Sequence, residues 1–219
     1  MIDIYTGTPG SGKSLDCAGV IRSALNKPRG EDRPVIANFD VNLQGVKRPQ
    51  AFHYIPNEEL TPSLLTEFAD DFWTHTDRRF SEDYLILALD ECQLVFNARS
   101  WMDRGRVGKK DSRMDWLEFF SQHRKYGYYV ILIAQSSKMV DNQFRMLIDN
   151  EINHRKVANM GLIGNVIGTM CFGRLFLRVK YLFQSRERLG MSLMWAKDKD
   201  MAMYDSYARL KQVTNKSKK

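Results

Sequence analysis

The segment Gly7-Thr8-Pro9-Gly10-Ser11-Gly12-Lys13-Ser14 decides the fold of this chain. It fills every fixed position of the pattern G-x-x-x-x-G-K-[ST], whose glycines let successive backbone N–H groups converge on phosphate oxygens. The flanking sequence agrees, because residues 2–6 are typical of a short strand and residues 15–26 carry apolar side chains at helical spacing. A strand, a glycine-rich loop and a helix in this order predict a binding site for a nucleoside triphosphate.

The polar residues of this loop have expected tasks in binding ATP and Mg²⁺. Lys13 is predicted to reach the β- and γ-phosphates as a mobile charge, and Ser14 is predicted to place its hydroxyl on the metal ion. The predicted nucleotide-binding residues are Gly7, Thr8, Pro9, Gly10, Ser11, Gly12, Lys13, Ser14 and Leu15. The sequence leaves open whether GTP can replace ATP.

Charge is distributed unevenly along the 219 residues. Residues 1–150 contain 19 Lys and Arg against 21 Asp and Glu, whereas residues 151–219 contain 14 against 5. A basic C-terminal portion beside a nearly neutral core indicates an anionic partner, either nucleic acid or the cytoplasmic face of a membrane. For residues 215–219 the alternative is a solvated basic tail.

The cysteines and the hydropathy of the sequence indicate in which cellular compartment the chain folds. The three cysteines lie far apart, which indicates a reducing compartment rather than a disulfide framework or a zinc site. No signal peptide precedes the strand at residue 2, so we expect a cytosolic domain. The longest uncharged stretch, residues 157–173, contains four glycines and is too short and too broken to predict a transmembrane helix.

Strands and helices are predicted to alternate up to about residue 150. We expect further strands at 34–40, 84–89 and 128–135, and further helices at 63–73, 115–125 and 141–150. This order predicts an α/β fold of the P-loop NTPase type, with a doubly wound, mainly parallel sheet whose ligands lie at the carboxyl ends of the strands.

The sequence changes character after residue 150. Residues 152–183 are predicted to form short antiparallel strands, with 161–171 as a glycine-broken segment, and 194–210 a loop with a short helix. We therefore expect a P-loop NTPase core at 1–150. The basic, β-rich elaboration at 151–219, with its C-terminal helix, is expected to belong to the same domain.

Two adjacent acids, Asp90 and Glu91, follow the apolar run of residues 85–89. A strand that ends in acids is the Walker B arrangement. Asp90 is predicted to hold Mg²⁺, and Glu91 to orient the water that attacks the γ-phosphate. Lys13 and Glu91 are therefore predicted catalytic residues, although Glu91 could instead only begin a solvated loop.

Two further catalytic tasks have candidates in the sequence. Gln135 ends the strand predicted at 128–135, where motor ATPases often place a sensor of the γ-phosphate, although a strand-ending Gln is also a common start of a loop. Phosphoryl transfer needs a further cation, and none is evident within the chain, which favours an arginine finger from a neighbouring subunit. Arg124, Arg145 and the basic loop 99–113 supply the candidates, each of them more often a surface residue when taken alone.

Four segments together resemble a known family. They are Thr6–Ser14, Leu89-Asp90-Glu91, Ser121-Gln122-His123-Arg124-Lys125-Tyr126-Gly127 with the strand 131–136 that follows, and Met203-Tyr204-Asp205-Ser206-Tyr207. The match is to the zonular occludens toxin (Zot)-like family, which includes the gene I assembly proteins of filamentous phages. The segments span nearly the whole chain, and the element at 123–127 is more specific than the phosphate-binding loop alone.

The resemblance implies an ATPase at the cytoplasmic face of the bacterial inner membrane that powers virion assembly and extrusion. It implies a homo-oligomeric ring such as a hexamer, with phage assembly and coat proteins and single-stranded DNA as partners. Family members normally continue into a transmembrane helix. This chain stops before such a segment, so we expect an excised cytosolic domain that reaches the membrane through a segment absent here.

Three other functions remain open at this point. The first is a soluble DNA-translocating ATPase, which would use the same site with a different partner. The second is a small-molecule kinase, for which the basic loop 99–113 would be the lid. The third is a non-catalytic nucleotide switch. An adjacent Asp-Glu pair favours a hydrolase over a kinase, because a kinase does not need to activate water.

Overall fold

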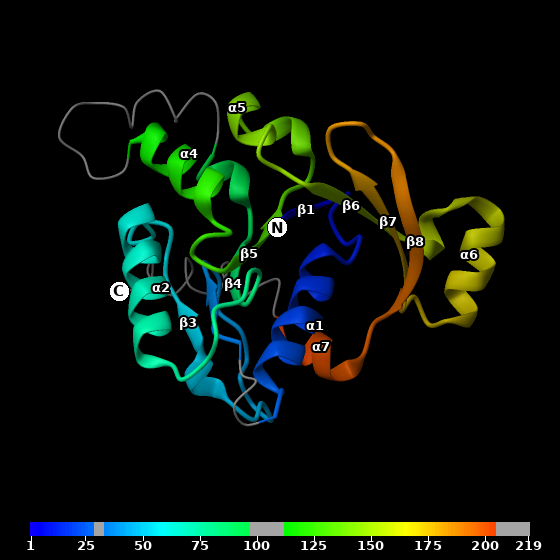
Figure 1. Ribbon diagram of the computed structural model, residues 1–219. Helices are drawn as coiled ribbons and strands as arrows, with labels where there is room; N and C mark the ends of the chain where they lie inside the picture. The colour runs from blue at the N-terminus through cyan, green and yellow to red at the C-terminus, as the bar shows by residue number, and fades with distance from the viewer. Residues whose placement is uncertain (29–32, 97–111, 205–219) are drawn as a thin grey trace, which may run out of the picture.

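A computed structural model describes residues 1–28, 33–96 and 112–204 of the chain (Figure 1). Its centre is one eight-stranded sheet in the order β3-β2-β4-β5-β1-β6-β7-β8. The strands are β1 (Ile2–Thr6), β2 (Val35–Ala37), β3 (Phe52–Tyr54), β4 (Leu85–Leu89), β5 (Tyr128–Ile133), β6 (Asn150–Lys156), β7 (Leu175–Leu182) and β8 (Arg188–Trp195). The predicted α/β fold with a mainly parallel sheet is confirmed, and the basic loop at 99–113 falls mostly outside the described residues.

The strands from β3 to β6 run parallel to their neighbours. Strands β1, β4 and β5 are almost entirely buried, which explains their near-continuous apolar sequences, since helices cover both faces of the sheet. One face carries α1 (Lys13–Leu25) and α7 (Asp198–Met203), and the other carries α2 (Pro62–His75), α4 (Arg113–Gln122) and α5 (Asn142–Arg145). This is the predicted doubly wound arrangement.

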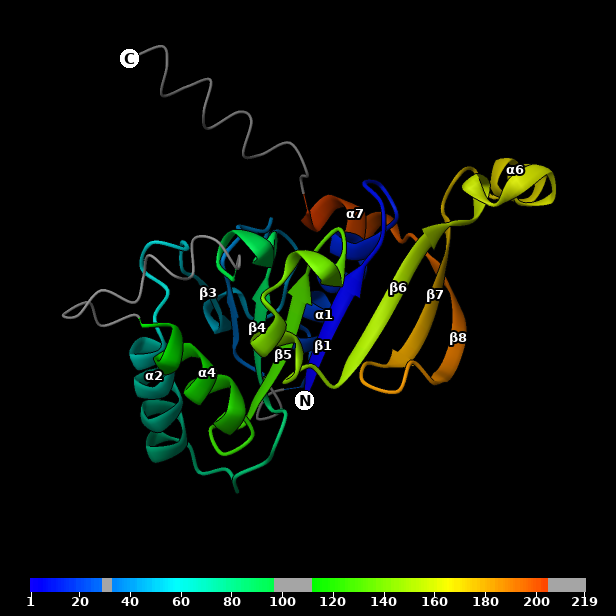
Figure 2. The ribbon, with the colours of Figure 1, turned by 90° about the horizontal axis from the view of Figure 1, so that it is seen from above.

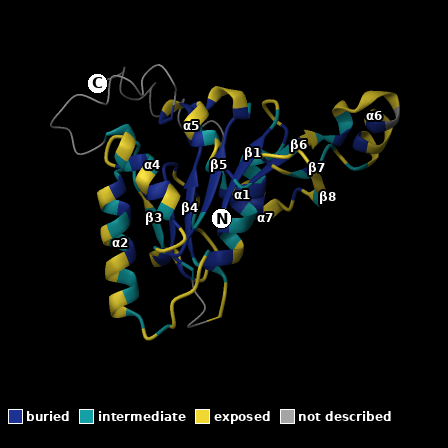
Figure 3. Cartoon of the chain, turned by 45° about the horizontal axis from the view of Figure 1, so that its top comes forward, coloured by how far each residue is buried: buried dark blue, intermediate teal, exposed yellow. Residues whose placement is uncertain are grey.

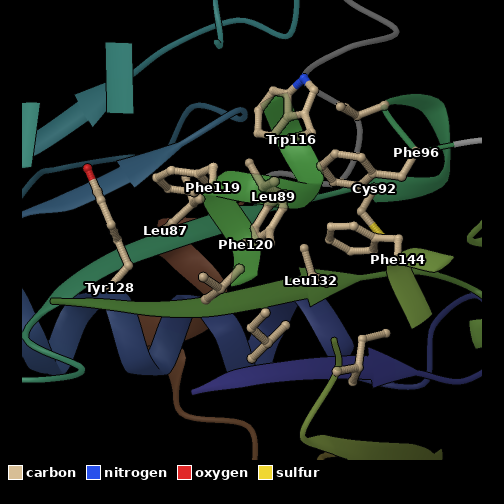
Figure 4. Packing of buried hydrophobic residues seen from close by; sticks show 14 of the residues in the cluster. Leu87, Leu89, Cys92, Phe96, Trp116, Phe119, Phe120, Tyr128, Leu132 and Phe144 are labelled. Atoms are coloured by element: carbon tan, nitrogen blue, oxygen red, sulfur yellow. The ribbon is translucent and has the colours of Figure 1, made fainter. Parts of the chain in front are cut away.

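Aromatic side chains fill the core on the α2–α4 face (Figure 4). Phe96 stacks on Phe144 with ring centroids 4.4 Å apart, and Trp116 stacks on Phe120 at 5.6 Å. All four rings are buried, so the segment that follows β4 is anchored to α4 and α5. The core therefore holds the carboxyl end of β4 in place.

The last part of the sheet forms an antiparallel extension, as predicted (Figure 2). Strand β7 pairs with β6, and β8 pairs with β7 as the edge strand. A buried carboxylate ties this extension to α1: Asp16 Oδ1 accepts from Arg178 of β7 at 2.8 Å, and Asp16 Oδ2 lies 2.9 Å from Nε2 of His154 of β6. The extension and the first helix are thereby fixed to each other.

Several sequence-based predictions of local structure were wrong. Residues 161–171 are not a broken strand but mostly a helix, α6 (Gly161–Met170), because Gly164 and Gly168 lie one helical turn apart and pack on the 3₁₀ turn η4 (Val157–Asn159). The helix expected at 141–150 is only the short α5, since β6 already begins at Asn150. Strands β3 and β8 were not predicted, and β6, which pairs antiparallel with β7 as predicted, also pairs in parallel with β1.

No helix in the described parts of the chain is long and apolar enough to cross a membrane.

Candidate nucleotide-binding site

The loop between β1 and α1 is built around glycines that no other residue could replace. Gly7 has a φ of 141°, and a Cβ there would lie 2.3 Å from the carbonyl oxygen of His154 in β6. Gly12 has a φ of 97°, and a Cβ there would lie 2.7 Å from the ring of Phe176 in β7. Both positions therefore require glycine for backbone conformation and for space. They let the loop curl back at the start of α1, the helix end that favours anions.

The loop contains an unsatisfied buried hydroxyl. Ser11 is almost fully buried, and its Oγ has no hydrogen-bond partner among the described residues. A buried polar group without a partner is costly, and such groups are few in folded proteins. A phosphate oxygen placed in the loop would accept this hydrogen bond. Ser11 therefore fits an anionic ligand in the position that the sequence motif predicts.

Lys13 bends back over the loop. Its Nζ donates to the carbonyl oxygens of Gly7 at 2.8 Å and Thr8 at 3.1 Å. Partial burial lowers the pKa of Lys13, while the carboxylates of Asp90 and Glu91 act in the opposite direction. The amine thus lies within electrostatic reach of both acids, and its present contacts are backbone carbonyls that it can exchange for phosphate oxygens.

Asp90 is held rigidly at the end of β4. Its backbone N–H donates to Asn38 Oδ1 at 2.7 Å, and its carbonyl oxygen accepts from Asn38 Nδ2 at 2.9 Å. Its buried carboxylate accepts from the backbone N–H of Glu91 at 2.8 Å and from the hydroxyl of Tyr204 at 2.6 Å. Carboxylate oxygens and hydroxyls are the ligands that Mg²⁺ prefers, so Asp90 and Ser14 have the right chemistry for a magnesium site.

Glu91 adopts a left-handed backbone conformation with a φ of 49°, which is uncommon for a residue other than glycine. Its carboxylate accepts a hydrogen bond from Nε2 of Gln93, two residues later. Such backbone strain is kept where the surroundings hold a side chain in a functional direction. The conformation turns Glu91 out of the line of β4, and the 3₁₀ turn η2 (Cys92–Leu94) begins directly after it.

Gln135 lies beside the loop, because β5 is the strand between β1 and β4. Its carbonyl oxygen accepts the backbone N–H of Gly7 at 3.2 Å, and its side chain is exposed. The sheet order therefore puts Gln135 between the loop that follows β1 and the acids that follow β4. Its task as a sensor of the γ-phosphate stays a prediction.

Two cavities flank the loop. A cavity of about 240 Å³ is lined by loop residues 10–15, including Leu15, and by three residues from distant elements, namely Phe176, Met201 and Tyr204. A larger one, about 740 Å³, is lined by Gly7, Thr8 and Gln135 together with Arg155, Lys156 and neighbouring residues of β6 and η4. The sequence analysis named neither Phe176 nor Met201 nor Arg155 as site residues.

The two arginines predicted to act as fingers do not contact the loop of their own chain. Arg124 donates to Asp149 Oδ1 at 3.1 Å, and Asp149 Oδ2 accepts the N–H of Ile2. Arg124 therefore lies at the amino end of β1, whereas the loop follows the carboxyl end of that strand. Arg145 donates to Asn142 Oδ1 at 2.9 Å within α5. Their assignment to the site of a neighbouring subunit stays a prediction.

Comparison with known proteins now places the chain. The family described as zonular occludens toxin (Zot) matches residues 1–210. The chain belongs to the Zot family. Among curated relatives, the Gene 1 proteins of Enterobacteria phage I2-2 and Salmonella phage IKe are 33% and 32% identical to it, in alignments that cover 78% of this chain and 45% of each relative. This member of the Zot family therefore spans about half the length of those proteins.

Solved structures agree on the fold of this Zot-family chain. The N-terminal domain of zonular occludens toxin from Neisseria meningitidis has a TM-score of 0.56 at 21% identity, covering 93% of this chain and 98% of that domain. The DNA-packaging ATPase B204 of Sulfolobus Turreted Icosahedral Virus has a TM-score of 0.50 at 15% identity, covering 90% and 97%. The predicted P-loop NTPase fold is confirmed.

Proposed function

We propose that this chain is a Mg²⁺-dependent ATPase domain that powers the assembly and extrusion of filamentous phage at the cytoplasmic face of the bacterial inner membrane. One observation carries the proposal: the glycine loop after β1 contains a buried hydroxyl at Ser11 with no hydrogen-bond partner among the described residues, and burial lowers the pKa of Lys13 in that loop while Asp90 and Glu91 oppose this shift. The relatives' name and the family fit this role, since one similar protein, from Pseudomonas phage Pf3, is called a putative assembly protein.

Phosphate binding follows from the loop. Backbone N–H groups at the start of α1, the Ser11 hydroxyl and the Lys13 ammonium are the donors available to the β- and γ-phosphates. Lys13 would leave the carbonyl oxygens of Gly7 and Thr8, which are neutral acceptors, for charged phosphate oxygens. Ser14 and Asp90 would hold Mg²⁺, and the ion would supply positive charge against the negative charge that develops during phosphoryl transfer.

Hydrolysis requires a positioned water molecule. Glu91 is the carboxylate whose backbone turns it out of β4 next to the metal ligand Asp90, so it is the residue that would orient and activate that water. Gln135, whose carbonyl oxygen accepts the backbone N–H of Gly7, would contact the γ-phosphate or the water with its side chain. Arg155 and Lys156 line the cavity on that side of the loop and add candidates from within the chain for the further cation.

The smaller cavity suits the nucleoside. Phe176 and Tyr204 contribute aromatic side chains, and Met201 and Leu15 contribute apolar side chains, to its lining next to the loop at the start of α1. A purine base stacks on aromatic side chains regardless of its polar edge. We therefore assign the base to this cavity and the γ-phosphate to the side of Gln135.

The test compares wild type with Glu91→Gln, using Glu67→Gln on the exposed surface of α2 as the matched control. ATP binding should survive in all three proteins, and hydrolysis should be lost in Glu91→Gln alone. Turnover is followed as protein concentration rises, with and without single-stranded DNA. A steeper than linear rise supports a shared site in a ring, since a finger from a neighbour contributes on the order of 10³–10⁵ in rate.

The remaining functions predict different results in the same experiment. A small-molecule kinase would keep phosphoryl transfer in Glu91→Gln. A nucleotide switch would show binding without turnover in either protein. Stimulation by single-stranded DNA without any link to phage proteins would favour a soluble DNA-translocating ATPase. Activity unchanged by Glu91→Gln and strictly proportional to concentration contradicts the motor proposal.

A further inference from the structure

Helix α6 projects from the body of the molecule at the far end of β6 and β7 (Figure 2). It lies within residues 157–173, a stretch of 17 residues that contains no charged side chain. Figure 3 shows most of this projection as exposed, in contrast to the buried core of the sheet. An apolar segment of this length in such a position is unusual for a surface in contact with water.

The helix is packed with its small residues inward. A Cβ on Gly164 would lie 2.5 Å from the carbonyl oxygen of Val157, and a Cβ on Gly168 would lie 2.5 Å from Ala158. The glycines therefore form the face that lies against η4, and several large apolar side chains on the other side of the helix are exposed. The most exposed of these are Leu162 (88%), Val166 (62%), Met170 (76%) and the following Phe172 (86%).

The spacing of these side chains makes one continuous face. Leu162, Val166 and Met170 are each one turn apart, so they form a row along the outer side of the helix. A helix normally places such a row against the core of its own protein. Here the core side is occupied by glycines, so the row can be buried only by something outside the described chain.

Basic residues surround the root of this projection. Arg155 and Lys156 precede it, and Arg174, which pairs with Asp198 at 2.7 Å, follows it. The region that carries it, residues 151–219, has nine more basic than acidic residues, from 14 against 5. An uncharged apolar tip with a basic root matches the layering of a membrane surface, in which acyl chains lie beneath anionic headgroups.

We propose that α6 is a membrane-surface anchor that inserts its apolar face into an anionic lipid bilayer. Ten helical residues span roughly 15 Å, which is about half of the hydrocarbon core, so the helix enters the surface and does not cross it. Leu162, Val166, Met170 and Phe172 enter the acyl boundary. Arg155 and Lys156 meet the lipid phosphates.

The anchor has a geometric consequence for the nucleotide site. Strand β6 runs parallel to β1, so α6 and the phosphate-binding loop both lie on the side of the sheet where the parallel strands have their carboxyl ends. Arg155 and Lys156 also line the cavity beside Gly7 and Gln135. Docking of α6 would therefore turn this side toward the membrane. The inference does not depend on hydrolysis, because the apolar row Leu162, Val166 and Met170 is not part of the lining of that cavity.

The experiment is flotation of the whole chain, without nucleotide, on vesicles of phosphatidylethanolamine and phosphatidylglycerol, and on vesicles of phosphatidylcholine alone. The test variant carries Leu162→Ser and Met170→Ser. The control carries Leu189→Ser and Met191→Ser on β8, which are 51% and 64% exposed in the wild type. All four positions are exposed, so both variants should fold. Circular dichroism and thermal unfolding check this.

We expect wild type and control to float with the anionic vesicles, more weakly with phosphatidylcholine, and less in high salt. The test variant should bind at least roughly tenfold more weakly, because two large apolar contacts are lost. Absence of binding to anionic vesicles, or equal binding by test and control variants, overturns the proposal. Self-association in sedimentation that is lost only in the test variant, without vesicle binding, also overturns it and assigns α6 to a second copy of the chain.

Discussion

Helices α1 and α6 begin in a similar way but bury different kinds of residue against the protein. A glycine with positive φ stands at the start of each: Gly12, at 97°, directly precedes α1, and Gly161, at 73°, is the first residue of α6. Helix α1 buries its apolar residues, with Cys17, Ile21 and Leu25 fully inaccessible, and leaves its N-terminal end open toward the loop. Helix α6 buries glycines and exposes Leu162, Val166 and Met170.

This difference shows that a run of apolar residues does not by itself determine which side of a helix packs against the rest of the protein. The sequence of α1 mixes polar and apolar residues, so burying one face satisfies the whole helix. The sequence of α6 has no charged residue and has glycines spaced one turn apart, so the side that permits close approach is its glycine side.

Truncation of one buried and one exposed β-branched residue should separate the two helices. Ile21→Ala removes a fully buried side chain from α1 and should lower the free energy of unfolding by about 2–4 kcal/mol, through lost burial and the cavity left behind. Val166→Ala on α6 should change it by no more than about 0.5 kcal/mol. Urea unfolding of both variants measures this. A large loss from Val166→Ala would mean that α6 is buried in solution.

Filling the glycine face of α6 should detach it from η4. In Gly168→Ala the new methyl meets the Cα and Cβ of Ala158 at 2.5 Å, and this backbone contact cannot yield cheaply. We expect a loss of about 1–3 kcal/mol, set against a helix-propensity gain of under about 1 kcal/mol. Hydrogen exchange across 157–173 should accelerate.

Gly190→Ala on β8 is the matched control for Gly168→Ala, because nothing lies within 4 Å of its Cβ position. It should leave exchange in 157–173 unchanged. If both alanine variants exchange alike, the glycines do not determine how α6 packs.

The contact between Tyr204 and Asp90 connects the end of the described chain to the nucleotide edge. Tyr204→Phe keeps the ring that packs edge-to-face on Phe39, with centroids 5.6 Å apart, and removes the hydroxyl that donates to the carboxylate. We expect a loss of about 1 kcal/mol in unfolding free energy, since the bond is charge-assisted but partly exposed. Tyr204→Ala should cost more. Equal stability of Tyr204→Phe and wild type would mean that the hydrogen bond is not maintained in solution.

The core of the fold was predictable because its signals are local. The loop motif, the five apolar residues of β4 and the helical spacing after Ser14 each depend on a few neighbouring residues. The predicted positions of Lys13 and Asp90 rest on the same kind of signal, and their tasks stay predictions. The antiparallel extension was predicted in outline, but its strand β8 was missed because that strand exposes apolar and polar residues alike.

The rest of the site depends on contacts between residues far apart in sequence. Asn38 holds both backbone groups of Asp90 across 52 positions, and Tyr204 reaches its carboxylate across 114. Phe176 enters the cavity beside the loop only because β7 pairs with β6. The local sequence of Asn38 and Phe176 does not mark them as site residues, and Tyr204 stood out only as part of the family resemblance. Only sheet order brings them to the loop.

Thiol reactivity tests the contrast between the buried α1 and the exposed α6 without a substitution that changes the stability of the protein. Cys17 in α1 is fully buried, and burial first, then the nearby Asp90 and Asp16 carboxylates, raise the pKa of its thiol. Cys92 is also fully buried, and burial raises its pKa likewise. Cys171, directly after α6, is only half-buried.

Since the thiolate is the reactive form, iodoacetamide should modify Cys171 alone in the native protein and all three cysteines after unfolding. Peptide mass spectrometry identifies the modified residue, and native Cys171→Ser should take up no label. Vesicles that cover α6 should slow the labelling of Cys171, whereas labelling of Cys17 at a comparable rate would show that α1 opens as readily as α6.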